Sequence, residues 1–112
     1  MVTVFKHRGD AIDFVPDTNL PAGSVVVIGD LVGVTKLDIA AGVAGSLHVS
    51  GVFAFEKATG ASSGIAAGTK VFWDAAAGVV TTDDDSGANK YVGKVTREAG
   101  DDDATVEVRV SQ

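Results

Sequence analysis

Cysteine is absent from this 112-residue sequence, which excludes both disulfide bonds and thiolate metal sites. Proline occurs only at Pro16 and Pro21, and aromatic residues make up 6% of the chain. No apolar run approaches the roughly 18 residues of a membrane span, so we expect no membrane partner. The N-terminal sequence also lacks the basic-then-apolar order of a secretory signal. We therefore expect a soluble protein that is made in the cytoplasm.

Positive charge is scarce as well. Nine Lys and Arg face fifteen Asp and Glu, giving a formal net charge of −6. Nucleic-acid binding depends on neutralising phosphates, and no basic stripe is present to do so, so we expect no nucleic-acid partner. The only basic cluster is Lys6–Arg8, whereas acidic residues are concentrated in Asp83–Asp85 and Asp101–Asp103. Such charged runs are typical of solvated loops.

A short phrase occurs three times, as LPAG at Leu20–Gly23 and as IAAG at Ile39–Gly42 and Ile65–Gly68. Each copy is followed within a few residues by an apolar run that is rich in β-formers. An aliphatic residue, two small residues and a glycine predict a tight corner that precedes a strand. Three such corners in one short chain indicate a small all-β domain with little room for a deep active site.

No segment has a helical period over ten or more residues, and short runs rich in Val, Thr and Phe alternate with Gly, Asp and Ser. We expect eight or nine strands in a small β-barrel or β-sandwich. The longest β signal is Ser46–Glu56, and Gly51 interrupts it. A glycine there predicts a bend that takes one long strand from one sheet into another.

Residues 1–19 are expected to form an N-terminal arm and linker, and residues 20–112 a single β-domain. The arm is very apolar for a segment that precedes the polar stretch Pro16–Pro21. We hypothesise that it packs on a neighbouring subunit or on a larger partner, with its cations paired to acidic groups there. The alternative is that it is an ordinary first strand of the core. The expected contact residues of the arm are Val4, Phe5, Lys6, His7, Arg8, Ile12 and Phe14.

Trp73 is the other candidate contact residue. It is adjacent to Phe72, and neighbours along a strand face opposite sides, so one ring is expected in the core and the other partly exposed. An exposed aromatic side chain is a candidate for an interface. The alternative, in which loops cover both rings, stays open.

Motifs that could carry chemistry are incomplete. Gly60–Gly64 matches G-x-S-x-G, but no helix is expected after it and both histidines, His7 and His48, precede the serine. The stretch Gly64–Lys70 lacks the residue order of a phosphate-binding loop. Neither Asp triplet has the spacing of a known calcium loop. We therefore expect no enzyme, no cofactor and no metal site.

Several phrases, taken in order, resemble a family of small tailed-phage and prophage proteins described as capsid cement or head-decoration proteins. They are GDAIDFVP at Gly9–Pro16, GDLVGV at Gly29–Val34, the two IAAG corners, SGVF at Ser50–Phe53 and KVFWD at Lys70–Asp74. The resemblance covers nearly the whole chain. It implies a β-tulip-like or barrel core with an extended N-terminal arm and no catalytic residues.

The resemblance also implies a role and partners. Such a protein binds the outside of an icosahedral head, through the major capsid protein and as homotrimers, and braces the virion against the pressure of packaged DNA. The competing interpretation is a β-sandwich module for host glycans, for which Trp73 and Tyr91 are the available aromatic platforms. A small hydrolase that uses Ser62 and His48 is the remaining alternative.

Overall fold

The computed structural model describes residues 2–112 and is all-β except for one short 3-10 helix, η1, at Asp85–Gly87. Nine strands form two antiparallel sheets, which confirms the expectation of an all-β chain. The strands are β1 (Ala11–Phe14), β2 (Val25–Ile28), β3 (Leu31–Thr35), β4 (Gly45–His48), β5 (Gly51–Glu56), β6 (Lys70–Asp74), β7 (Val79–Thr81), β8 (Lys90–Arg97) and β9 (Thr105–Val110).

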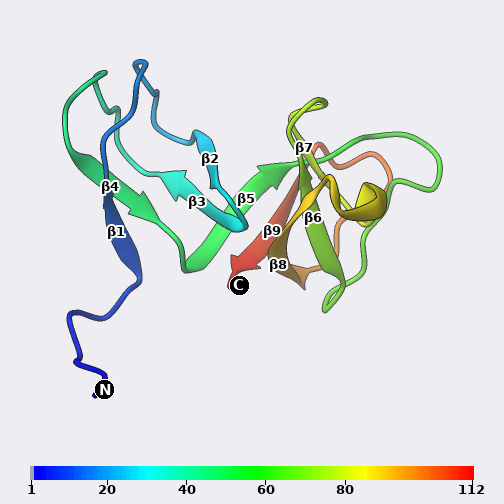
Figure 1. Ribbon diagram of the computed structural model, residues 1–112. Helices are drawn as coiled ribbons and strands as arrows, with labels where there is room; N and C mark the ends of the chain where they lie inside the picture. Colours follow the sequence, from blue (N-terminus) through cyan, green and yellow to red (C-terminus); the bar gives the residue numbers. More distant parts are fainter. Residues whose placement is uncertain (1) are drawn as a thin grey trace.

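The first sheet has the strand order β1-β4-β3-β2 and the second has the order β5-β9-β8-β6-β7. They lie side by side, and the chain crosses between them from β4 to β5 (Figure 1). An isolated parallel bridge between Lys57 and Val80 links the end of β5 to β7. Neither sheet closes into a barrel within residues 2–112, and the tulip-like arrangement stays a prediction.

The bend predicted at Gly51 is present. Gly51 has φ of 131°, a backbone conformation that residues other than glycine rarely adopt. It lies where the chain leaves the first sheet and enters the second. His48 still pairs with Val34 in the first sheet, whereas Gly51 already pairs with Val110 in the second. One glycine thus divides a continuous β signal between two sheets.

The three repeated corners share one turn. Their glycines have φ of 85°, 76° and 84°, and in each corner a backbone N–H bonds to the carbonyl three residues earlier. A four-residue turn in which only the third residue has a positive φ is a type II turn. The glycines are Gly23, Gly42 and Gly68. The first two corners also pair with each other, because Leu20 and Ile39 exchange two backbone hydrogen bonds of 2.8 Å.

One hydrophobic core spans both sheets. Val32 and Val34 of β3 are buried against residues of the second sheet, and Val92 of β8 lies in the same cluster at 0% exposure. On the opposite face of the first sheet, the fully buried Leu47 packs over Gly33, where a Cβ would lie 2.5 Å from the leucine Cγ. The remaining core side chains are Phe55, Ile65, Val71, Val80, Val95, Ala99, Val106, Val108 and Val110.

Candidate interaction surfaces

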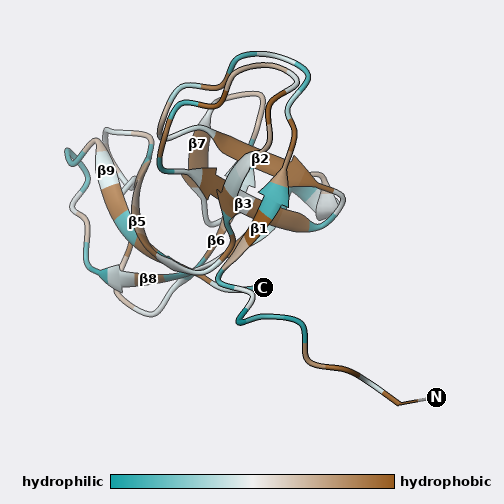
Figure 2. Cartoon of the chain, turned by 90° about the vertical axis from the view of Figure 1, so that its left-hand side faces the viewer, coloured by the Kyte–Doolittle hydropathy of each residue, from teal (hydrophilic) through white to brown (hydrophobic). Residues whose placement is uncertain are grey.

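The segment before β1 exposes apolar side chains. Residues 2–9 lie outside both sheets, and Val2, Val4 and Phe5 are 85%, 64% and 80% exposed. The segment leads away from the body, with hydrophobic residues toward its end and hydrophilic residues nearer the sheet (Figure 2). These side chains are therefore free to contact another molecule. Met1, the first residue of the expected arm, lies outside the described residues.

The same segment is positively charged relative to the rest of the chain. Residues 2–9 contain Lys6 and Arg8 and no carboxylate, whereas residues 10–112 contain seven Lys and Arg against fifteen Asp and Glu. Arg8 lies 3.3 Å from the Asp10 carboxylate, and both side chains are exposed. His7 accepts a hydrogen bond from the Gly9 N–H at 3.2 Å. The segment thus presents cationic and apolar side chains together.

Ile12 and Phe14 lie in a different setting from Val4 and Phe5. They belong to β1, an edge strand, where Ile12 pairs with Leu47 and Phe14 pairs with Gly45. Both side chains are half-buried on the face of the first sheet that holds Leu47. These two expected contact residues therefore lie in the first sheet. Val4 and Phe5, by contrast, precede the sheet and are exposed.

Trp73 lines a cleft between the two sheets. The cleft has a volume of about 630 Å³, and its aromatic floor comes from Phe53, Phe55 and Trp73 of the second sheet. The ring centroids of Phe55 and Trp73 are 6.3 Å apart, and the Lys36 ammonium lies 5.9 Å from the centroid of Phe53. Val25 of the first sheet forms part of the opposite wall. Trp73 is half-buried, and its exposed part faces this cleft.

The two aromatic platforms considered for a glycan do not share a groove. Tyr91 pairs with Phe72, and their rings meet edge to face at 5.8 Å. Tyr91 lines a separate depression with Asp30, Lys90 and Gln112, whereas Trp73 lines the cleft between the sheets. A sugar site built on both rings is therefore not present in this arrangement.

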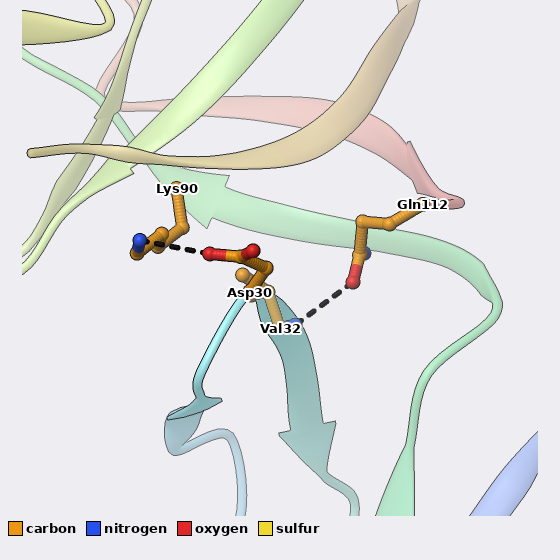
Figure 3. A network of polar contacts seen from close by, with 4 residues as sticks. All are labelled: Asp30, Val32, Lys90 and Gln112. Atoms are coloured by element: carbon orange, nitrogen blue, oxygen red, sulfur yellow. Dashed lines mark hydrogen bonds and ion pairs between the residues drawn. The ribbon is translucent and has the colours of Figure 1, made fainter. Parts of the chain in front are cut away.

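A polar clasp, made of Asp30, Val32, Lys90 and Gln112, ties the two sheets together (Figure 3). The Lys90 ammonium donates to the Asp30 carboxylate at 2.8 Å and holds the pKa of that carboxyl below its usual value. The Gln112 side chain accepts from the Val32 N–H at 2.8 Å and donates to the Val92 carbonyl at 2.9 Å. No local sequence signal marks this contact, because Val32 and Gln112 are 80 residues apart.

One acidic triplet organises loops. The Asp101 carboxylate accepts the Gly64 N–H at 2.7 Å, and its backbone carbonyl accepts the Gly60 N–H at 2.9 Å. Asp103 accepts the Gly100 N–H at 2.8 Å. Within residues 2–112 no group of three or more metal-ligating side chains gathers, and no helix is long and apolar enough to cross a membrane. The triplet at Asp101 is thus partly structural, which its composition did not reveal.

The serine motif is not assembled with a histidine. Ser62 lies in a loop with φ of 64°, and no hydrogen bond connects it to His7 or His48 in the part of the chain that is described. His48 lies on β4 of the first sheet, where burial, and secondarily the charge of Lys36, lowers its pKa. The catalytic arrangement that G-x-S-x-G requires is therefore missing from the geometry.

Comparison with known proteins gives one match. The sequence model of a family described as phage cement protein matches residues 6–110. No curated protein and no solved structure matches the chain. The matched range covers both sheets, all of the clasp except Gln112, and all of the expected contact residues except Val4 and Phe5.

Proposed function

This chain belongs to the phage cement protein family, and on that premise we propose that it is a structural protein of the outer capsid surface. It binds the major capsid protein of an assembled head, after synthesis in the cytoplasm of the host, and performs no catalysis. Its value lies in the contacts that it adds to the shell. The family supports a capsid decoration role, and the details below rest on the exposed surfaces of the chain.

The observation that carries this proposal is the segment ahead of β1. Val4 and Phe5 are largely exposed, and burying apolar area contributes about 25 cal/mol per Å². Lys6, His7 and Arg8 follow directly and suit an acidic partner surface. A segment of this kind adds contact area without enlarging the core. We place the first contact with the head, or with a neighbouring cement subunit, at these five residues.

Ile12, Phe14 and Trp73 form the second part of the proposed interface. Ile12 and Phe14 continue the apolar residues of segment 2–9 onto the edge of the first sheet. Both side chains are half-buried, so part of their apolar surface is available to a partner. Trp73 offers its indole ring through the cleft between the sheets. Burying a partly exposed aromatic side chain is a common source of binding free energy at interfaces. These residues would secure the body after the arm has bound.

We further propose that the protein acts as a homotrimer. A stable interface needs about 800 Å² on each partner, roughly a ninth of the 6981 Å² surface of this chain. A single contact of that size uses much of the apolar area that the chain exposes. Three copies bound at once multiply modest contacts through a high effective concentration. A trimer that bridges capsid subunits would oppose their separation under the pressure of packaged DNA.

The test is cosedimentation with undecorated heads. The truncation should remove residues 2–9 only, because Ala11–Phe14 forms a strand of the first sheet. The double variant Val4→Ser with Phe5→Ser is the subtler probe, and Val52→Ser is its matched control, since Val52 is an exposed apolar residue (57%) on the body. We expect the truncation and the double variant to bind at least about tenfold more weakly. Undiminished binding by a folded truncated protein would contradict the proposal.

Two further measurements address assembly and bracing. Sedimentation equilibrium of the free protein, and counting of copies on purified particles, should give multiples of three. Decorated heads should retain DNA at temperatures that open undecorated heads, because a ligand that binds only the intact shell stabilises it by mass action. A monomer that is absent from mature particles would end the structural interpretation.

A further inference from the structure

Lys57 is a buried cation directly after β5. Its exposed fraction is 4%, and it is the only charged residue among the buried side chains of residues 2–112. Its backbone N–H donates to the Ala104 carbonyl at 2.9 Å. Its isolated bridge to Val80 links the end of β5 to β7, the two edge strands of the second sheet. The backbone is therefore held in place, and the side chain is confined with it.

The Lys57 ammonium forms no direct ion pair within residues 2–112. This group makes one hydrogen bond, to the Ala58 carbonyl at 2.7 Å, although an ammonium can donate three. Throughout residues 2–112, no carboxylate oxygen lies within 4.0 Å of it. A buried charge is costly unless it is paired and fully hydrogen-bonded. Two donors of this cation are thus available to an acceptor from outside the chain.

Lys57 lines a pocket of about 360 Å³ that is rich in hydroxyl groups. Ser62, Ser63 and Thr82 also line it, and none of their hydroxyls forms a hydrogen bond with the described residues. Ser62 adopts φ of 64°, in the left-handed region that non-glycine residues enter at a cost. A cation and several unpaired hydroxyls in one hollow are groups that bind an oxyanion.

Asp74 sets the charge that the pocket accepts. It is the only acidic residue of the lining, and its carboxylate accepts the Ala76 and Ala77 N–H groups at 3.1 Å each. For a dianion the attraction of Lys57 and the repulsion of Asp74 both double and largely offset each other, whereas the cost of removing the ligand from water rises more steeply with its charge. The pocket therefore suits a single negative charge better than a phosphate. A carboxylate also matches the small number of donors.

We propose that the pocket at Lys57 is a binding site for a carboxylate group, held by the Lys57 ammonium and by the hydroxyls of Ser62 and Ser63. This inference does not depend on the proposed function. The carboxylate can be that of a free small acid or that of an Asp or Glu side chain on a neighbouring protein. The chemistry of recognition is the same in both cases.

The first experiment is an NMR titration of the ¹⁵N-labelled protein with sodium acetate, replacing sodium chloride so that ionic strength stays constant. We expect saturable shifts of the amides of Ala58, Ser62, Ser63 and Gly64, with a dissociation constant on the order of millimolar. Sodium phosphate at the same concentration should bind more weakly. Shifts that do not saturate, that spread evenly over the surface, or that are larger for phosphate would overturn the proposal.

Variants identify the groups responsible. Lys57→Met keeps the length of the buried stem and should weaken acetate binding at least about tenfold. Asp74→Asn removes the opposing charge and should strengthen acetate binding several-fold. If Lys57→Met does not fold, the double variant Ser62→Ala with Ser63→Ala leaves the lysine in place and should weaken binding about threefold or more. Wild-type affinity in the folded variants would refute the assignment.

The source of the carboxylate is distinguished by a second arm. Lys57→Met that has lost acetate binding and no longer sediments with heads indicates that a side chain of the capsid occupies the pocket. Lys57→Met that has lost acetate binding and sediments normally indicates a free small acid. Either result supports the site, whereas equal acetate binding by Lys57→Met and the wild type rejects it.

Discussion

Replacing Gln112 with alanine should loosen the junction between the two sheets. Gln112 supplies both an acceptor to Val32 and a donor to Val92, so the substitution breaks two hydrogen bonds at once. Val32 is fully buried, and its N–H lies on the edge of β3 beyond the part that pairs with β4. That pairing includes only Val34 and Thr35 of β3. No neighbouring strand can replace the lost acceptor.

The magnitude follows from what each partner keeps. The Val32 N–H is left buried without an acceptor, which costs about 1–3 kcal/mol. The Val92 carbonyl still accepts the Ser111 N–H at 3.0 Å, so its loss is smaller, about 0.5–1 kcal/mol. The free energy of unfolding should fall by about 1.5–4 kcal/mol, which corresponds to a decrease in Tm of about 6–16 °C for a domain of this size.

The assay combines thermal unfolding with hydrogen exchange at the Val32 amide. Ser111→Ala is the matched control, because the Ser111 side chain makes no hydrogen bond within the described residues while its backbone N–H is kept. We expect this control to stay within about 0.5 kcal/mol of the wild type. If Gln112→Ala changes Tm by no more than the control and leaves the Val32 amide protected, the clasp does not stabilise the junction.

Three other perturbations test separate parts of the structure. Gly93→Ala would put a Cβ 1.8 Å from a backbone oxygen of β9, and it should lower the unfolding free energy, measured by urea titration, by about 3 kcal/mol or more. Its control is Gly100→Ala, where the nearest atom to the new Cβ lies at 3.7 Å and the effect should be nearly neutral. Asp101→Ala should cost about 1–2 kcal/mol and Asp102→Ala almost nothing, by the same measurement. The pKa of His48 in the folded protein lies below its ordinary 6.5, so the unfolded chain binds this proton more readily. Tm should therefore fall as the pH drops from about 6.5 toward the folded pKa. His48→Gln should remove this dependence of Tm on pH.

Much of the fold could be predicted from the sequence because its signals are local. A type II corner needs only a glycine and small neighbours, so the three repeated corners were readable directly. The bend at Gly51 was also predictable, since a glycine that interrupts a long β signal has few other uses. The alternation of valines with charged residues in the last strand is a local signal of the same kind, and the structure buries Val106, Val108 and Val110.

Contacts between distant residues could not be predicted in this way. Nothing near Gln112 indicates that it caps a backbone group of β3, because the partner is defined only once both sheets have formed. The burial of Lys57 was also invisible, since a lysine after a strand and before a polar loop is typical of a solvated surface. Asp101 shows the same limit, because its loop-closing bond joins it to Gly64.

The candidate interface stays a prediction. Composition indicated an arm over residues 1–19, and the structure leaves Val2, Val4 and Phe5 exposed but pairs Ala11–Phe14 with β4. The sequence placed Trp73 on one of two faces without choosing between them, because strand alternation gives no absolute direction.

The division of the chain at Gly51 also determines the order in which its parts become available on the ribosome. The first sheet uses residues 11–48, but β3 packs against β8, which begins only at Lys90. At about 5–20 residues per second, the roughly forty residues between His48 and Lys90 take about 2–8 s to synthesise. During that interval the nascent chain displays an apolar sheet face and the open valine-rich edge of β2, so its yield in an overexpressing cell should depend on translation speed and on chaperone capacity.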